Sequence, residues 1–175
     1  MSEAGRTNSG DLESRAEDRH HDSLRLWLRL LACTMLIERT VRTRLFRRFA
    51  TTLPRFDLMA QLERSPDGLR MGELSRLMMV TGGNVTGIVD QLVIEGFVER
   101  RAIAADRRAL AVKLTPKGRR RFIAMAAEHE RWIEEILADL PAAERTRLYA
   151  LLGHLKAAIR GDATDTAAPS TGDLA

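Results

Sequence analysis

Residues 84–118, NVTGIVDQLVIEGFVERRAIAADRRALAVKLTPKG, change their apolar periodicity in the middle. Four apolar residues in the first part have the i, i+3, i+4, i+7 spacing of a buried helical stripe. They are Val85, Ile88, Val89 and Leu92. After Gly96 apolar residues alternate with polar ones, which predicts β-strands at 97–103 and 110–114. The pattern therefore predicts an amphipathic helix that ends at Gly96 and is followed by a β-hairpin.

A second short helix is predicted directly before this one, at residues 71–80, MGELSRLMMV. The side chains expected to face inward are Met71, Leu74 and either Leu77 or Met78, and those expected to be exposed are Glu73 and Arg76. Residues 80–82 break the helix, and Thr81 is placed to cap the N-terminus of the next one. Two short helices joined by a few residues, the second with small and polar residues at its front, form the helix-turn-helix pattern.

Positive charge gathers around the predicted hairpin. The chain has a net charge of +4, but residues 97–121 alone hold nine basic and two acidic residues. The expected hairpin tip, residues 104–108, contains Asp106, Arg107 and Arg108. Hairpin tips are often charged simply because they are solvated. A local excess of this size nevertheless indicates a surface for nucleic acid.

Longer helices are predicted on both sides of this segment. The expected helices are 24–49, 55–64 with Pro54 in its first turn, 116–137 after a Thr115 cap, and a last one that begins at Pro141. The fold class is therefore expected to be mainly α with a small β-hairpin wing.

Composition excludes several classes of protein. With 45% apolar and 30% charged residues over 175 positions, we expect one domain with its own core. No run reaches the roughly 18 apolar residues of a membrane span, and the N-terminus lacks a secretory signal, so we expect a cytoplasmic protein. The single cysteine, Cys33, cannot form an internal disulfide, and no cysteine or histidine grouping has zinc spacing. No nucleophile–base pattern, P-loop or dinucleotide fingerprint is present, so we expect neither an enzyme nor a cofactor.

Two of these segments resemble the MarR (multiple antibiotic resistance regulator) family of winged helix-turn-helix transcriptional regulators. Residues 106–118, DRRALAVKLTPKG, are similar to the wing signature of the family, in which Asp-x-Arg is followed by an alternating strand, Leu-Thr and a nearby Gly. Residues 84–100, NVTGIVDQLVIEGFVER, are similar to its recognition helix running into the wing. The resemblance covers residues 22–160 and implies a winged helix-turn-helix held between one long N-terminal helix and two C-terminal helices.

The resemblance also implies that the front of the recognition helix contacts DNA. Asn84 can make a bidentate contact to adenine, and the methyl group of Thr86 can meet thymine. Arg108 resembles the arginine that family members place in the minor groove, oriented here by Asp106. The expected DNA contacts are Ser75, Arg76, Thr81, Gly82, Gly83, Asn84, Thr86, Gly87, Asp106, Arg107 and Arg108, with Arg100 and Arg101 as further candidates for phosphate contacts.

The outer helices have more apolar surface than one small core can cover, and the resemblance implies that they interlock with a second copy. We therefore expect a homodimer whose recognition helices enter successive major grooves about 34 Å apart on a pseudo-palindrome. The interface candidates are Leu24, Trp27, Leu28, Leu151, Leu155 and Ile159, with packing inside one chain as the alternative for some of them. The expected organisation is a disordered tail at 1–20, a dimerisation and effector helix at 21–52, a DNA-binding domain at 53–115, dimerisation helices at 116–160 and a disordered tail at 161–175.

Most members of the family leave DNA when a small ligand binds between the dimer helices and the winged domain. Glu38 and Arg42 interrupt an apolar stripe of the first helix with an i, i+4 ion pair, which marks either a pocket or the edge of the buried arc. The segments 24–40 and 53–62 are similar to the subgroup that controls aromatic acid catabolism, which implies an aromatic acid or its CoA thioester as effector. The expected effector residues are Met35, Glu38, Arg39, Arg42, Phe46 and Phe56.

Two alternatives to a ligand-responsive repressor remain open. A helical protein-interaction module would keep the winged fold without reading DNA. A redox sensor of the same family would use Cys33, but its apolar neighbours Leu30, Leu31 and Met35 predict a buried, structural cysteine.

Overall fold

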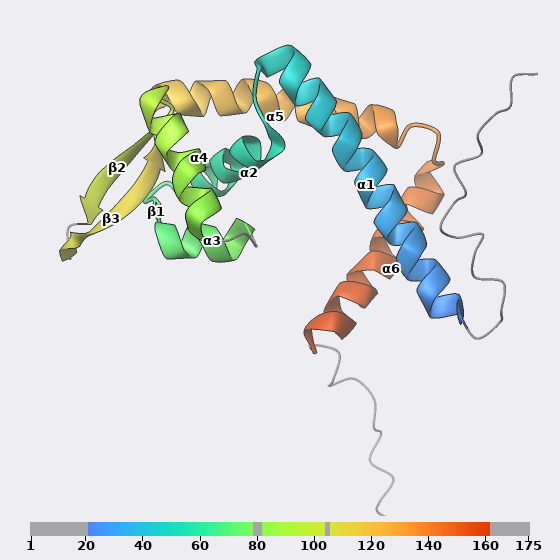
Figure 1. Ribbon diagram of the computed structural model, residues 1–175. Helices are drawn as coiled ribbons and strands as arrows, with labels where there is room; N and C mark the ends of the chain where they lie inside the picture. Colours follow the sequence, from blue (N-terminus) through green and yellow to red (C-terminus); the bar gives the residue numbers. More distant parts are fainter. Residues whose placement is uncertain (1–20, 79–81, 104–105, 162–175) are drawn as a thin grey trace, which may run out of the picture. The chain divides into compact units, whose positions relative to one another are not determined.

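The computed structural model describes residues 21–78, 82–103 and 106–161. The elements are, in order, α1 (Asp22–Phe49), α2 (Leu53–Glu63), β1 (Leu69–Arg70), α3 (Met71–Met78), α4 (Gly82–Ile94), β2 (Val98–Ile103), β3 (Asp106–Leu114), α5 (Pro116–Ile136) and α6 (Ala142–Arg160) (Figure 1). The described residues up to Trp132 form one compact unit, and those from Ile133 onward form a second. The mainly α fold with a small wing is confirmed. The tails predicted at 1–20 and 161–175 lie, apart from Gly161, outside the described residues.

A three-stranded antiparallel sheet has β3 in its centre, in the order β1-β3-β2. Leu69 of β1 lies opposite Val112, and Val98 of β2 lies opposite Leu114. The sequence did not predict β1, because two residues are too few for an alternating pattern. The prediction that β3 begins at 110 is wrong by four residues, since it begins at Asp106.

The core of the winged part forms between α2, α3, α4 and the sheet. α4 contacts α2, α3 and β2. The predicted stripe of α4 is confirmed, with Val85, Val89 and Leu92 buried and Ile88 half-buried at its edge. Further buried residues of this core are Leu58, Met59, Leu62, Leu74, Val98 and Val112. Of the two alternatives on α3, Met78 is half-buried and Leu77 is exposed. The prediction that Glu73 is exposed is wrong, since it is half-buried and its carboxylate accepts a hydrogen bond from the backbone N–H of Arg70 at 2.7 Å.

Gly96 ends α4 as predicted. It has a left-handed backbone (φ 73°), and its N–H donates to the carbonyl of Val93 at 2.9 Å. The next N–H, that of Phe97, donates to the carbonyl of Leu92 at 2.9 Å. This pair of bonds satisfies the last carbonyls of the helix and turns the chain directly into β2. The prediction that Thr115 caps α5 is also confirmed, because its Oγ1 accepts the N–H of Gly118 at 3.0 Å.

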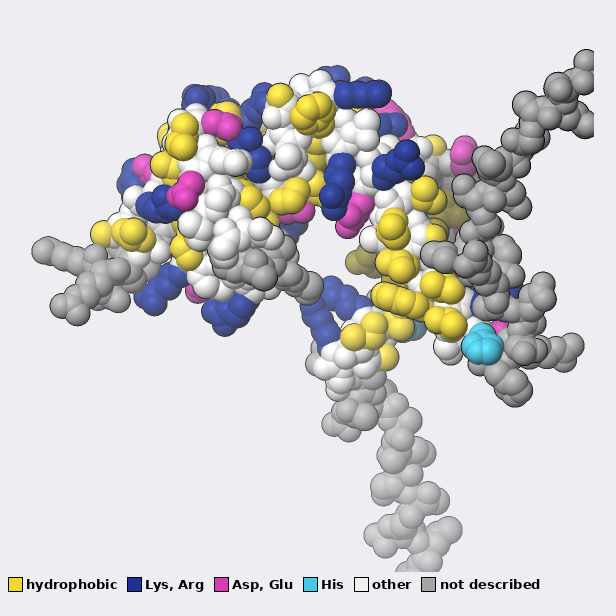
Figure 2. Space-filling view, viewed as in Figure 1, with side chains coloured by type: hydrophobic (Ala, Val, Ile, Leu, Met, Phe, Trp, Pro, Cys, Tyr) yellow, Lys and Arg dark blue, Asp and Glu magenta, His cyan; other side chains and the backbone are white. Residues whose placement is uncertain are grey.

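The two outer helices have large exposed apolar side chains. On α1 only Val41 and Leu45 are buried, and hydrophobic side chains gather along its N-terminal half (Figure 2). None of the residues of α6 is buried. Of the interface candidates, Leu28 is half-buried and Leu24, Trp27, Leu151, Leu155 and Ile159 are exposed. Cys33 is exposed as well, so the prediction that it is buried is wrong: its neighbours Leu30 and Leu31 are half-buried, but Cys33 and Met35 lie on the exposed side of α1.

Among the described residues, no single helix is long and apolar enough to cross a membrane. The bent pair of α3 and α4 reaches that length and apolarity only when both are taken together. The apolar stripe of this pair is used in the core, since Leu74, Val85 and Val89 are buried there.

Candidate nucleic-acid interface

The N-terminal part of α4 has a buried side and an exposed side. Val85 is buried, whereas Asn84 on one side of it and Thr86 on the other are exposed. The predicted outward position of both polar side chains is therefore confirmed. Because the buried stripe fixes the rotation of α4, these side chains are held on its exposed face.

Two glycines on the same exposed side are not required by the fold. A β-carbon added to Gly83 or Gly87 would meet no atom of the described chain within 4 Å. Glycine lowers helix stability by about 1 kcal/mol relative to alanine. Because Gly83 and Gly87 have no side chains, the backbone of α4 is accessible on this face and a partner can approach it closely. Gly82 begins α4, and Thr81, the predicted cap, lies outside the described residues.

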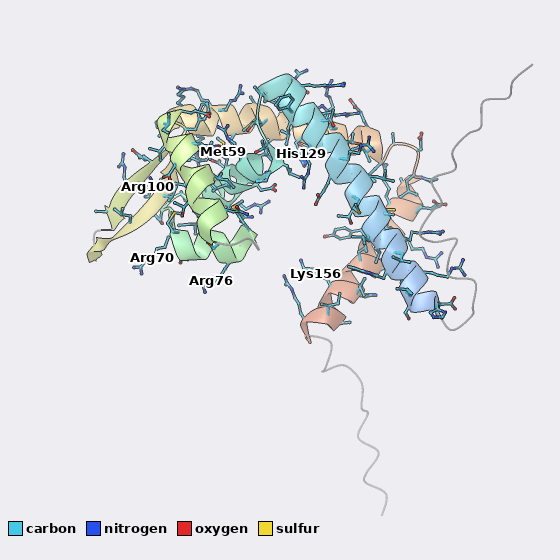
Figure 3. All side chains as sticks on the ribbon, in the orientation of Figure 1. Met59, Arg70, Arg76, Arg100, His129 and Lys156 are labelled. Carbon is cyan, nitrogen blue, oxygen red and sulfur yellow. The ribbon has the colours of Figure 1, made fainter. Side chains whose placement is uncertain are left out.

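α3 supplies basic and polar groups next to this face. Ser75 is half-buried and Arg76 is exposed, with its Nε donating to the carbonyl of Gly72 at 3.4 Å. Arg70 and Arg76 project from the same side of the winged part in Figure 3. Sequence reasoning missed Arg70 as a candidate, since its place beside α3 depends on β1, which pairs with β3.

The wing carries several arginines with different surroundings. Asp106, Arg107 and Arg108 are the first three residues of the strand β3, so the prediction that they form the hairpin tip is wrong. Their side chains lie outside the described part of the chain. Arg100 of β2, labelled in Figure 3, forms an ion pair with Asp90 of α4. Arg101 pairs with Glu99 at 2.7 Å. The basic charge of Arg100 and Arg101 is therefore partly neutralised inside the chain.

Comparisons with known proteins agree with this arrangement. Residues 51–110 match the sequence profile of the MarR family. A crystal structure of a MarR family transcriptional regulator from Silicibacter pomeroyi superposes with a TM-score of 0.70 and 32% identity, over 82% of this chain and 99% of that chain. This chain belongs to the MarR family.

Curated relatives of this MarR-family chain carry the names of transcriptional regulators. The HTH-type transcriptional regulator PecS of Dickeya dadantii is 27% identical over 70% of this chain and 75% of its own length. The transcriptional activatory protein BadR of Rhodopseudomonas palustris is 28% identical over 82% of this chain and 86% of its own length. The MarR-family chain is therefore a DNA-binding regulator.

The six predicted effector residues do not lie together in the MarR-family chain. Met35 and Phe46 are 61% and 69% exposed on α1. Arg39 borders a groove of about 430 Å³ along α1, together with Arg44 and Arg47. Phe56 instead belongs to the core, where its ring stacks on Phe122 with centroids 5.5 Å apart. Helical periodicity in the sequence predicts on which face of its helix each residue lies. It does not predict which groove that face borders, so it could not show that these residues lie apart.

Glu38 and Arg42 do border one groove, of about 330 Å³, between α1, α2 and α3. They pair at 3.0 Å, and both side chains are about half exposed, so the pair lies at the edge of the buried arc. Asp57 of α2 lines the same groove. Burial raises the pKa of Asp57 above 3.8, the charge of Glu38 adds to this rise, and Arg42 opposes it.

Proposed function

We propose that this regulator binds a specific DNA operator with the exposed N-terminal face of α4 and with its wing. The observation that supports this most directly is the division of α4 into a buried stripe at Val85, Val89 and Leu92 and an exposed polar face at Asn84 and Thr86. A helix held in this way can enter a major groove without losing its own core contacts.

Seven of the predicted contacts have a chemical role in this proposal. Asn84 recognises adenine through a bidentate hydrogen bond, and the methyl group of Thr86 contacts a thymine. Arg76 binds phosphate, with Ser75 beside it, so that α4 is held in register. Arg108 enters the minor groove with its guanidinium oriented by Asp106, and Arg107 adds a phosphate contact.

A homodimer forms the complete regulator in this proposal. Two winged parts place their α4 helices about 34 Å apart, so that the operator is a pseudo-palindrome. The exposed apolar residues of α1 and α6 support this, since a single chain leaves Trp27, Leu151 and Ile159 in water. A second copy of this chain offers the same surfaces and would cover them.

The regulator acts as a repressor in this proposal, and a small aromatic acid or its CoA thioester releases it from DNA. Arginines along α1, among them Arg39 and Arg47 at the groove described above, offer charge for a carboxylate or for the phosphates of CoA. The activatory name of BadR makes the direction of regulation a question for a reporter gene: repression predicts higher expression when the gene for this protein is deleted.

Fluorescence anisotropy with a duplex from upstream of the protein's own gene tests the proposal. At about 50 mM and about 200 mM salt, affinity falls steeply with salt for a protein that neutralises several phosphates. Arg108→Ala lowers affinity severely, and Asn84→Ala reduces base preference by roughly 1–3 kcal/mol at one position per half-site. Arg64→Ala, an exposed arginine that directly follows α2 and is not among the proposed contacts, is the control.

Equal binding of the wild type and of Arg108→Ala would contradict the role of the wing. Weak binding to every duplex, without salt dependence, would favour the helical protein-interaction module instead.

A further inference from the structure

An ion pair joins the recognition helix to the wing. It is formed by Asp90 of α4 and Arg100 of β2, and Arg100 is labelled in Figure 3. Both side chains are partly covered, with exposed fractions of 51% for Asp90 and 31% for Arg100. α4 and β2 belong to the same compact unit and are in contact there. The pair therefore connects the two elements that the proposed function places on DNA.

The geometry of the sheet directs Arg100 toward α4. In the register of β2 and β3, Arg100 lies opposite Val112 and Val98 lies opposite Leu114. Residues that lie opposite one another, and residues two apart on one strand, share a face of the sheet. Val98 and Val112 are both buried, so Arg100 lies on the face that packs on the core. Its long side chain reaches from this face to the carboxylate of Asp90.

The geometry of the helix puts Asp90 on the exposed side of α4 that holds Thr86. The two residues are four positions apart and both are exposed, so they are neighbours along one face. A lone carboxylate on this face would repel DNA phosphates, and a lone guanidinium would attract the phosphates of any sequence. Because Asp90 and Arg100 pair with each other, each charge is compensated within the chain.

The pair is a second point of attachment between α4 and the wing. The first is the turn at Gly96, whose carbonyl accepts a hydrogen bond from the hydroxyl of Thr115 at 2.8 Å. A wing attached at one point alone can rotate about that point. The contact between Asp90 and Arg100 lies beyond the turn on both elements, so it fixes the angle between them.

This angle governs both proposed reading ends. Along α4, Asp90 is about 9 Å from Asn84 at the front of the helix. Along β2, Arg100 is about 10 Å from Ile103 at the far end of the strand. A small rotation at the pair therefore moves the front of α4 and the far end of the wing relative to each other.

We infer that Asp90 and Arg100 are positioning residues that determine specificity, because they hold the wing at the angle at which both elements engage one half-site. The inference rests on the proposed function. An operator is read in the major groove by α4 and in the minor groove by the wing, so both must be in place at once. An unrelated duplex is held by phosphate contacts, which tolerate a shifted wing. Arg100 then acts through Asp90 and is not itself a phosphate contact.

Charge and positioning predict opposite results for Asp90→Asn. The substitution removes a negative charge from the exposed side of α4, so charge alone predicts tighter binding to every duplex. Positioning predicts weaker binding to the operator, since the wing loses its second point of attachment. The sign of the change in operator affinity therefore separates the two explanations.

Fluorescence anisotropy of the full chain tests the inference with two duplexes, one from upstream of the protein's own gene and a scrambled one of the same length and base composition. We expect Asp90→Asn and Arg100→Gln each to lower affinity for the upstream duplex about tenfold. Asp90→Asn should bind the scrambled duplex at least as tightly as the wild type. The double variant should lose no more than the weaker single variant, because both substitutions break the same interaction.

Glu63→Gln is the matched control. It breaks the ion pair of 3.1 Å between Glu63 of α2 and Arg119 of α5, and it changes the net charge by the same amount as Asp90→Asn. Neither residue is a proposed DNA contact, so this variant should discriminate between the duplexes like the wild type. Urea unfolding of every variant shows that it is folded under the conditions of the binding assay.

An Asp90→Asn variant that binds the upstream duplex as tightly as the wild type, or more tightly, would overturn the inference. So would single-variant losses that add up in the double variant. If Asp90→Asn does not fold, Arg100→Gln carries the test between about 50 mM and about 200 mM salt. The salt slope should stay that of the wild type, whereas a slope smaller by about one would make Arg100 a phosphate contact.

The wild type on the same two duplexes separates this inference from the proposed function. Equal affinity for both duplexes refutes the proposed function, and the inference with it. A wild type that prefers the upstream duplex, with a preference that Asp90→Asn retains, refutes the positioning role alone.

Discussion

A β-carbon on Gly118 would lie 1.9 Å from the carbonyl oxygen of Phe97, well inside contact distance. The first turn of α5 therefore packs at Gly118 directly against Phe97, which lies between α4 and β2. Thr115 holds this approach together: its hydroxyl donates to the carbonyl of Gly96 at 2.8 Å, and its N–H donates to that of Phe97 at 3.0 Å. The Thr and Gly of the wing signature thus fix the recognition helix, the wing and α5 to one another.

We expect Gly118→Ala to lower the free energy of unfolding by about 3 kcal/mol, because the new methyl group overlaps a backbone atom that cannot turn aside. Urea unfolding at a fixed protein concentration measures this. Gly72→Ala on α3 is the control, since its β-carbon meets nothing within 4 Å and alanine favours a helix. Unchanged stability of Gly118→Ala would mean that α5 can move away from Phe97 at little cost.

Gly83→Ala and Gly87→Ala should separate folding from DNA binding. Both positions have open space, so neither methyl group strains the fold, and Gly87→Ala is expected to raise stability by up to about 1 kcal/mol. Both substitutions are expected to weaken operator binding, because the methyl groups cover backbone that approaches the phosphates. If Gly87→Ala binds the operator like the wild type, α4 does not approach DNA closely at that position.

The sequence predicts those features that depend on chemistry within a few residues. The stripe of α4, its end at Gly96 and the Thr115 cap are all encoded by local spacing and local hydrogen bonds. The strand β1 escapes prediction because Leu69 and Arg70 become a strand only by pairing with residues about forty positions later.

Contacts between distant residues are harder to predict for the same reason. Arg55 and Glu95 form an ion pair across forty residues, and Arg121 reaches Phe49 across 72. Helical periodicity places each residue along its own segment but does not reveal which distant residue it meets. Cys33 shows the opposite error, since apolar neighbours in sequence predict burial only if another surface covers them.

His129 should make stability depend on pH. Burial lowers its pKa below 6.5, and its ring lies 5.0 Å from that of Phe56. As pH falls through 6.5, the unfolded chain binds a proton before the folded chain does, so stability decreases on acidification. His129→Gln should flatten this part of the profile in urea unfolding between about pH 5 and pH 8. His154→Gln, exposed on α6, is the matched control; a His129→Gln profile that keeps the wild-type slope would contradict the assignment.

Asp57 should make stability fall as pH rises, which is opposite to the effect of His129. Burial and the charge of Glu38 raise its pKa above 3.8, so between 3.8 and that raised pKa the folded chain binds more protons than the unfolded chain. Stability from this group is therefore present at low pH and is lost as pH rises through the raised pKa. Asp57→Asn removes the loss, so we expect a variant more stable than the wild type near neutral pH, with the difference shrinking toward pH 3.8. Glu38→Gln should make the rise in the pKa of Asp57 smaller, because it removes the neighbouring negative charge. An Asp57→Asn variant less stable than the wild type near neutral pH would show that Arg42 stabilises the ionised carboxylate by more than burial and Glu38 destabilise it.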